Sequence, residues 1–117
     1  MSVPGDLWQW RSEERADRTV VILAGELDVS SADELRRRLA ATIRVRPVVD
    51  VDLRGLTFID STILSVFIGA HQDATGAGGS LTVLNPTGHV HRVLDVTGVL
   101  PLLGPKDEPG PARAEAQ

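Results

Sequence analysis

The sequence contains no cysteine among its 117 residues. Disulfides and thiolate metal sites are therefore excluded, and the absence fits a reducing cytosol. Long apolar runs are also missing, because the longest one, Val20–Ala24, is far short of the ~20 residues that a membrane helix needs. The first ten residues lack the basic and apolar segments of a secretory signal. We therefore expect a cytoplasmic protein that does not bind membranes.

The sequence has no strong excess of charge of either sign. Twelve basic and sixteen acidic residues give a net charge of −4, which argues mildly against a nucleic-acid partner. The length suits one domain that buries roughly two-thirds of its unfolded surface. The last residues, 104–117, are rich in Pro, Gly, Ala and charge. We expect a single domain over residues 1–103 and a disordered tail over 104–117.

Metal, cofactor and catalytic motifs are also absent. His89 and His91 lie two apart on a predicted helix and so do not share a face. The glycines Gly76, Gly78 and Gly79 are not followed by the Gly-Lys-Ser/Thr of a phosphate-binding loop. We therefore predict no metal site, no cofactor and no catalytic residue.

What the sequence does contain is an alternation of strand and helix patterns. Runs rich in β-branched and apolar residues predict strands at Leu7–Arg11, Arg18–Ala24, Val48–Leu53 and Ser80–Leu84. Apolar residues at helical spacing predict helices at Ala32–Ile43 and Ser61–Ala74 and a third between Asn85 and Gly98. Ser31 and Glu34 match the capping-box pattern at the start of the first helix.

This order of elements predicts an α/β fold with a mixed central sheet. The first two strands form a hairpin, and right-handed crossovers make the last three strands parallel, with an antiparallel edge strand. In the third strand Val49, Val51 and Leu53 alternate with Asp50 and Asp52. The helices are therefore expected to pack mainly on one face of the sheet. Val99–Leu103 is expected to dock on the core.

The most informative segment is Leu56–Leu64, LTFIDSTIL, where a strand runs into a helix. Free N–H groups and the helix dipole favour an added anion at a helix start. The hydroxyl of Ser61 is therefore a plausible phosphoacceptor. Because parallel strands direct their carboxyl ends to one end of the sheet, Asp28, Asp60 and Ser61 are expected to be neighbours on one surface.

Three motifs stand out in order along the chain: GELD at 25–28, DLRGLTFIDST at 52–62 and RVLDVTGV at 92–99. Together they resemble motifs of the STAS domain family, in particular its free-standing bacterial anti-sigma factor antagonists. The resemblance spans roughly residues 5 to 103. It implies partner switching, in which the unphosphorylated protein binds an anti-sigma factor that is also a serine kinase. Phosphorylation of the serine after the aspartate, here Ser61, then releases the partner, and a serine/threonine phosphatase resets the switch.

The resemblance also suggests which residues take part. Ser61 is the expected phosphoacceptor, and Thr62 is the second choice. The expected partner-binding residues are Asp28, Asp60, Ser61, Thr62 and Ile63. Ile63 departs from the family pattern, which usually has glycine there. A bulky side chain at an exposed helix start would alter kinase docking or mark a member without phosphorylation.

Two other functions are compatible with the same residues. One is a diverged, non-phosphorylated STAS scaffold subunit of a larger regulatory or transport complex, which Ile63 favours slightly. The other is a small hydrolase that uses Ser61 with a histidine and an aspartate. The Gly-x-Ser-x-Gly nucleophile elbow of such enzymes is absent, since Ile59 and Ile63 flank Ser61.

Overall fold

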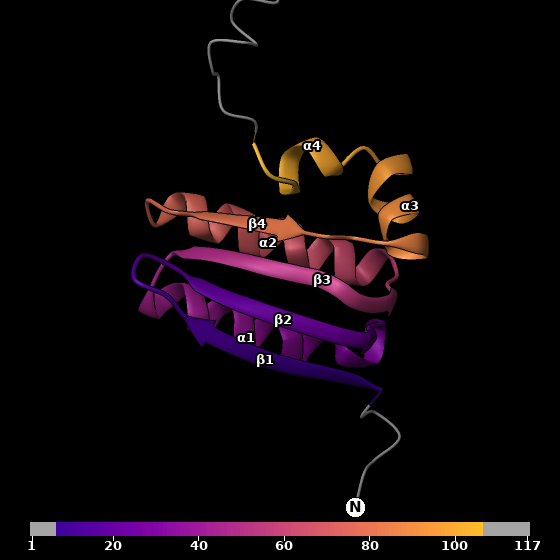
Figure 1. The fold of residues 1–117 in the computed structure, drawn as a ribbon, viewed down its shortest axis with the longest axis horizontal. Coiled ribbons are helices and arrows are strands. Elements are labelled where there is room, and N and C mark those ends of the chain that lie inside the picture. Colours follow the sequence, from indigo (N-terminus) through magenta and orange to yellow (C-terminus); the bar gives the residue numbers. More distant parts are fainter. Residues whose placement is uncertain (1–6, 107–117) are drawn as a thin grey trace, which may run out of the picture.

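Four strands form one mixed sheet in the order β1-β2-β3-β4 in the computed structural model of the chain, which describes residues 7–106. The strands are β1 (Trp8–Glu14), β2 (Thr19–Glu26), β3 (Val48–Phe58) and β4 (Ser80–Leu84). β1 pairs with β2 antiparallel, whereas β2, β3 and β4 are parallel (Figure 1). The predicted parallel trio with an antiparallel edge strand is confirmed.

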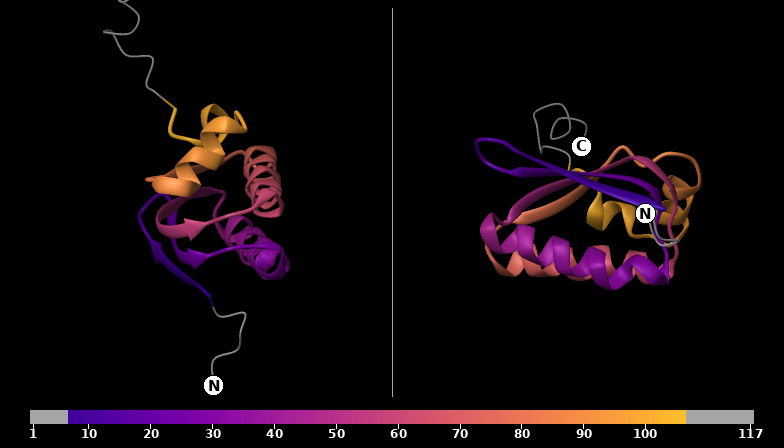
Figure 2. Two further views of the ribbon diagram at one scale, coloured as in Figure 1. Left: turned by 90° about the vertical axis from the view of Figure 1, so that its right-hand side faces the viewer. Right: turned by 90° about the horizontal axis from the view of Figure 1, so that it is seen from below.

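Two long helices cover one face of this sheet. They are α1 (Ala32–Val45), preceded by the short 3-10 helix η1 (Val29–Ser31), and α2 (Ser61–Gly76). Figure 2 shows α1 and α2 side by side on the same side of the strands. The shorter α3 (Gly88–Val96) and α4 (Leu100–Leu103) lie at the β4 side (Figure 1). The helices thus pack mainly on one face, as the alternation in β3 predicted.

The core lies between the sheet and these helices. The inward residues of the strands and the apolar stripe of α1 have almost no exposed surface: Val21, Leu23, Leu35, Leu39, Val49, Val51 and Leu53. The α2 helix contributes a wider apolar surface that includes fully buried Phe67. Burial of each such side chain is worth about 1.5–3 kcal/mol. The alternation of buried and exposed residues therefore sets which face of each element turns inward.

The strands are longer than their apolar patterns indicated. β1 continues to Glu14, β2 includes Gly25 and Glu26, and β3 continues from Leu53 to Phe58. The pairing of β2 with β3 becomes irregular after Ile22. Both strands continue beyond the residues in which apolar and polar side chains alternate. The pattern of apolar residues marks only the core-facing part of a strand, whereas ladder hydrogen bonds extend it further.

The start of α1 corrects one prediction. Ser31 does not form a capping box with Glu34, since its side chain makes no hydrogen bond to cap α1. Its hydroxyl instead accepts the N–H of Asp28 at 3.5 Å, within a capping box of η1. Ser31 directly precedes α1, as the pattern placed it, but it is also the last residue of η1, and its side chain caps that turn instead of α1.

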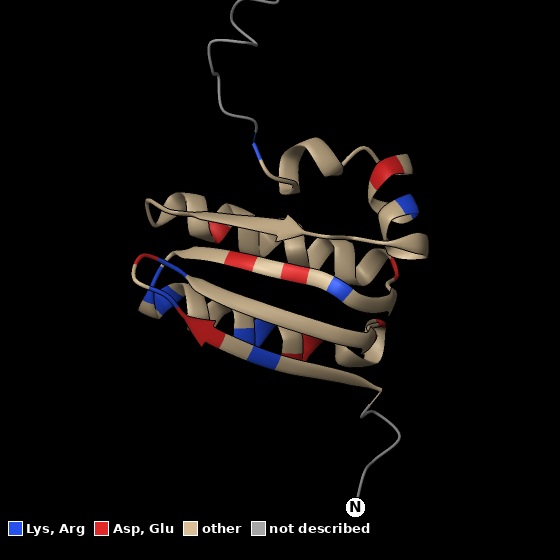
Figure 3. Ribbon diagram, viewed as in Figure 1, with Lys and Arg blue, Asp and Glu red and all other residues tan. Residues whose placement is uncertain are grey.

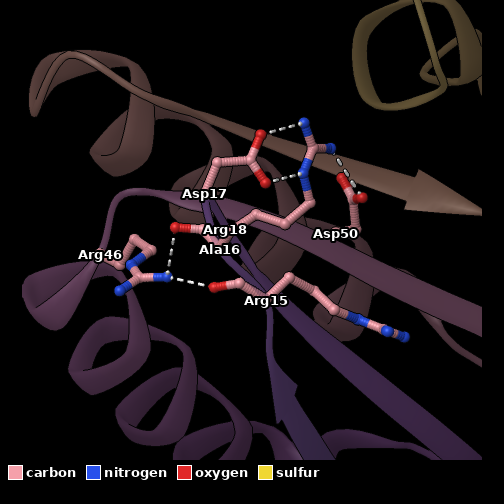
Figure 4. A network of polar contacts seen from close by, with 6 residues as sticks. All are labelled: Arg15, Ala16, Asp17, Arg18, Arg46 and Asp50. Atoms are coloured by element: carbon pink, nitrogen blue, oxygen red, sulfur yellow. Dashed lines mark hydrogen bonds and ion pairs between the residues drawn. The ribbon is translucent and has the colours of Figure 1, made fainter.

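The amino ends of the parallel strands are joined to the β1–β2 hairpin by arginines (Figure 4). Arg46, which follows α1, donates to the carbonyls of Arg15 at 2.6 Å and Ala16 at 3.4 Å. Arg18 pairs with Asp17 at 3.2 Å and with Asp50 at 2.9 Å. Asp50 on the polar face of β3 thereby gains an ion-pair partner from the hairpin.

Gly25 is required by the close approach of β1 to β2. Its φ of +96° lies in the left-handed region, which side chains disfavour. A Cβ at this position would collide with the carbonyl oxygen of Leu7. The next residue, Glu26, donates its N–H to that same oxygen at 3.0 Å. Gly25 thus permits the contact that anchors the beginning of β1.

The C-terminal segment docks as expected up to the end of α4. Leu103 has no exposed surface, and Lys106 donates through Nζ to the carbonyls of Pro101 at 2.7 Å and Leu102 at 2.6 Å. Residues 107–117, which hold most of the predicted tail, lie outside the described residues. The domain boundary at residue 103 stays a prediction.

Candidate functional site

Three turns meet at the carboxyl end of the parallel strands, at the right-hand side of Figure 1. The N–H of Leu27, after β2, donates to the carbonyl of Phe58 at the end of β3, at 3.0 Å. His89, in the first turn of α3, has Nε2 3.3 Å from the carbonyl oxygen of Ile59. The prediction that these turns share one surface is confirmed.

Asp60 joins two of these turns through its carboxylate. One oxygen, Oδ1, accepts the N–H of Ile63 at 3.1 Å and so caps α2. The other, Oδ2, accepts the N–H of Val29 in η1 at 3.0 Å. A carboxylate that accepts backbone N–H groups at a helix start also interacts favourably with the helix dipole. Asp60 therefore holds the start of α2 against η1.

Asp28 organises η1 in the same way. Its Oδ1 accepts both the N–H of Ser30 at 2.9 Å and the hydroxyl of Ser30 at 2.6 Å. These hydrogen bonds, that of the hydroxyl first, lower the pKa of Asp28. Asp28 is therefore ionised at neutral pH. Neither Asp28 nor Asp60 has an ion-pair partner within residues 7–106.

Ser61 and Thr62 begin α2 directly after this cap. Ser61 is exposed and Thr62 is partly buried. The carbonyl of Ser61 accepts the hydroxyl of Ser65 at 3.3 Å. The part of the chain that the structure describes gives the Ser61 hydroxyl no histidine as a hydrogen-bond partner. The Ser61 side chain is thus accessible at a helix start.

Ile63 corrects the expectation that its side chain is exposed at the start of α2. The prediction placed its side chain at an exposed helix start, but none of its surface is exposed. The side chain packs in the core cluster, because the third residue of α2 already faces the sheet. Ile63 therefore cannot contact a partner directly through its side chain in this conformation, and its N–H serves the Asp60 cap.

Two exposed apolar residues of this surface were not predicted. Val29 in η1 is 67% exposed and Phe58 at the end of β3 is 40% exposed. The Phe58 ring stacks on His89, with 5.1 Å between ring centroids and 3° between their planes. The sequence did contain a signal for Val29. It is an apolar residue directly after the GELD turn, and it does not belong to the apolar stripe of α1. Phe58 lay outside the predicted strand.

Residues 7–106 hold no group of three or more His, Cys, Asp or Glu residues suited to a metal ion. Within the same residues, no helix is both long and apolar enough to cross a bilayer. This surface presents the hydroxyls of two serines, two carboxylates, two apolar side chains and one imidazole: Ser30, Ser61, Asp28, Asp60, Val29, Phe58 and His89.

The described residues thus form a four-stranded mixed sheet with two long helices on one face, and Ser61 directly follows the cap of the second of these helices. The family model described as Mlab, STAS domain matches residues 10–104, and the chain belongs to the STAS domain family.

Curated relatives share this part of the chain. The anti-sigma-B factor antagonist of Bacillus subtilis is 35% identical over 79 residues, which cover 68% of this chain and 72% of the relative. The anti-sigma F factor antagonist of Paenibacillus polymyxa is 31% identical over 86 residues, covering 72% and 74%.

A solved structure agrees with the fold. An anti-sigma factor antagonist from Mycobacterium paratuberculosis superposes with a TM-score of 0.75 at 23% identity, covering 99% of this chain and 97% of that one.

Proposed function

We propose that this protein is an anti-sigma factor antagonist that works by partner switching in the cytoplasm. In its unphosphorylated form it binds an anti-sigma factor that is also a serine kinase. That kinase phosphorylates Ser61, the complex dissociates, and a serine/threonine phosphatase restores the binding form. The names of the curated relatives support the class of function.

The observation that carries the proposal is the position of Ser61. It is exposed, it directly follows the Asp60 cap, and that cap is bonded to the neighbouring turn. A kinase or a binding partner can therefore reach the hydroxyl on a surface whose backbone is held in place. Thr62, which is partly buried, is the second choice of acceptor.

The same position explains why a phosphate would leave the domain folded. Phosphoserine adds about −1.5 to −2 charges at neutral pH. At a helix start the dipole offsets part of that charge, by about 0.3–1 kcal/mol at an exposed site. The helix therefore tolerates the modification.

The phosphate destabilises the complex with the partner. A dianion placed against a closely packed partner loses its hydration or meets like charge, and a buried charge without a counter-charge costs several kcal/mol. Each ~1.4 kcal/mol is a tenfold change in affinity. One phosphate is thus sufficient to convert micromolar binding into negligible binding.

Phosphosite mapping tests the proposal. The protein is isolated from its own cells and is also incubated with ATP and each anti-sigma factor kinase of the same genome. Ser61→Ala should abolish the phosphate. Ser65→Ala, which changes another exposed serine one turn further along α2, should leave it unchanged. If a kinase binds the protein but no phosphate forms on Ser61 or Thr62, the non-phosphorylated STAS scaffold is the better description.

A further inference from the structure

The edge strand β1 has one side that is not paired. Among the described elements, β1 has only β2 as a neighbour in the sheet, whereas α4 packs beside the other edge strand, β4 (Figure 1). The free side of an edge strand presents backbone N–H and C=O groups that can pair with a further strand. Such a strand needs a feature that either prevents or directs pairing.

The hydrogen bonds of the hairpin show which residues of β1 point to the free side. Glu26 donates its N–H to Leu7, and Arg15 donates its N–H to Arg18, at the two ends of the hairpin. Inward and outward backbone groups alternate along an antiparallel strand. Together with the register of β1 and β2, this leaves the N–H and C=O groups of four residues directed outward: Trp8, Trp10, Ser12 and Glu14.

The side chains between these residues carry charges of opposite sign. Arg11 and Glu13 lie two apart on one face of β1, with Nη2 of Arg11 3.6 Å from Oε2 of Glu13. Their side chains are 70% and 41% exposed. Charges of one sign on an edge strand repel a second copy of it. An Arg and a Glu at this spacing can instead complement each other across two copies.

We propose that β1 pairs antiparallel with β1 of a second copy of this chain, about a two-fold axis through Ser12. In this register Ser12 lies opposite Ser12 of the second copy, and Trp10 lies opposite Glu14 of the second copy. All of these residues direct their backbone groups outward, so the ladder is satisfied. Arg11 then lies opposite Glu13 of the second copy, twice per dimer, in the pairs where cross-strand side chains come closest.

The charges distinguish this register from the next one. An axis through Arg11 uses the same outward backbone groups, but it places the two Arg11 side chains directly opposite each other, which is destabilising. The opposite charges of Arg11 and Glu13 therefore favour the axis through Ser12 over the axis through Arg11, and Figure 3 shows a basic and an acidic segment on β1. The dimer would be one continuous eight-stranded sheet.

The pairing leaves the surface around Ser61 free. β2 lies between β1 and β3 in the sheet, and Ser61 follows β3. The dimer therefore rests on no part of the proposed function and does not occupy the docking surface.

Analytical ultracentrifugation of the full chain, from low micromolar to several hundred micromolar, tests the dimer. Arg11→Glu and Glu13→Arg should each weaken self-association at least about tenfold, which corresponds to about 1.4 kcal/mol. The double variant Arg11→Glu/Glu13→Arg restores opposite charges across the axis and should return the association constant to within about threefold of the original. Arg37→Glu, on the exposed surface of α1, controls for the change in net charge.

Backbone pairing is tested separately with Ser12→Pro, which removes an outward N–H at an edge position where proline is tolerated. It should leave the protein monomeric, with circular dichroism confirming the fold. A chain that is monomeric at every concentration overturns the proposal. So does a dimer whose stability is unchanged by the three charge variants, because its interface must then lie elsewhere. The charge variants decide the question if Ser12→Pro does not fold.

Discussion

The two ends of the sheet are stabilised in different ways. At the amino end, guanidinium groups make the connections, with Arg46 on hairpin carbonyls and Arg18 between Asp17 and Asp50 (Figure 4). At the carboxyl end, within residues 7–106, the carboxylates of Asp28 and Asp60 accept only backbone N–H and serine hydroxyl groups.

This difference bears on where a new charge can act. Each aspartate of the amino-end network has a cation beside it, so the charges there are already matched. At the carboxyl end the structure describes no ion pair for Asp28 or Asp60. A phosphate added there is tolerated through the helix dipole. Such a surface is suited to a switch, whereas the amino end is suited to stability.

The largest difference between the ends is expected for an added charge. Ser61→Asp should weaken binding to the anti-sigma factor kinase at least about 100-fold, since one closely packed contact becomes an uncompensated charge. Ser80→Asp changes an exposed serine at the amino end of β4 and should leave affinity unchanged. Isothermal titration calorimetry gives both affinities. Unfolding of Ser61→Asp, or equal loss in the two variants, would contradict the interface account.

Removal of the Asp60 carboxylate should have the next largest effect, on stability. Asp60→Ala loses the helix cap and the bond to Val29 together, at a cost of about 2 kcal/mol. Chemical denaturation measures this loss. Asp73→Ala, on the exposed side of the same helix, should change the free energy of unfolding by less than about 0.5 kcal/mol. A similar loss in both variants would show that Asp60 does not connect the turns.

Exposed valines at the two ends should differ in partner binding. Val29→Ser should reduce affinity for the kinase about tenfold, because an apolar contact beside Ser61 is lost. Val45 is 78% exposed at the end of α1, near the opposite end of the sheet. Val45→Ser should bind like the unmodified protein in the same titration. If Val29→Ser also binds normally, η1 lies outside the contact surface.

At the amino end, loss of Arg46 should affect stability alone. Arg46→Ala removes the bonds to the hairpin carbonyls and should cost about 1 kcal/mol in thermal unfolding, without changing kinase affinity. Arg44→Ala, an exposed arginine in the last turn of α1, is the matched control and should be nearly neutral. A change in kinase affinity for Arg46→Ala would mean that the two ends are coupled.

The smallest expected effect is a change of aspartate pKa with salt. It distinguishes a pKa lowered by a neighbouring arginine from one lowered by serine hydrogen bonds. Arg18 lowers the pKa of Asp17, through a hydrogen bond and its charge, whereas hydrogen bonds from Ser30 lower the pKa of Asp28. Added salt screens exposed charges, so the pKa of Asp17 should rise toward its ordinary value of 3.8. The pKa of Asp28 should change less. NMR titration of the carboxyl carbons at two salt concentrations measures both shifts.

The sign of the associated stability change is the same for both aspartates. Each carboxyl has a lower pKa in the folded protein than the ordinary 3.8. Each therefore stabilises the fold above that value, and the contribution is lost as the pH falls through the lowered pKa. Asp28→Asn should accordingly differ from the unmodified protein at neutral pH and approach it under acid conditions. A difference that grows on acidification would reverse the assignment.

The sequence was sufficient to predict the parallel trio of strands with its antiparallel edge strand and the meeting of the three turns. Both follow from apolar periodicity and from the shared direction of parallel strands, which depend on local patterns and general geometry. The Val29 to Asp60 hydrogen bond was not predictable in the same way. It depends on η1, a three-residue turn whose sequence carries no periodic signal, and on the tertiary distance between two loops.

Ile63 shows where the reasoning from sequence failed. Its place just after the exposed Ser61 suggested an exposed side chain, but the helix begins close to the core, and one residue separates exposed Ser61 from buried Ile63. The orientation of the first turn relative to the sheet decides this. The helical spacing of the buried residues Ile63, Phe67 and Ala70 places Ile63 on the core-facing side of α2.

The residues of the GELD segment, which begins at Gly25, have different structural roles. Its first residue accommodates the neighbouring strand, its third, Leu27, is fully buried, and only the fourth, Asp28, shapes the surface turn. A methyl group at position 25 would displace the beginning of β1 from β2. Loss of partner binding after Gly25→Ala would therefore report a dislodged edge strand, and a mutational scan of this segment needs a separate folding assay at every position.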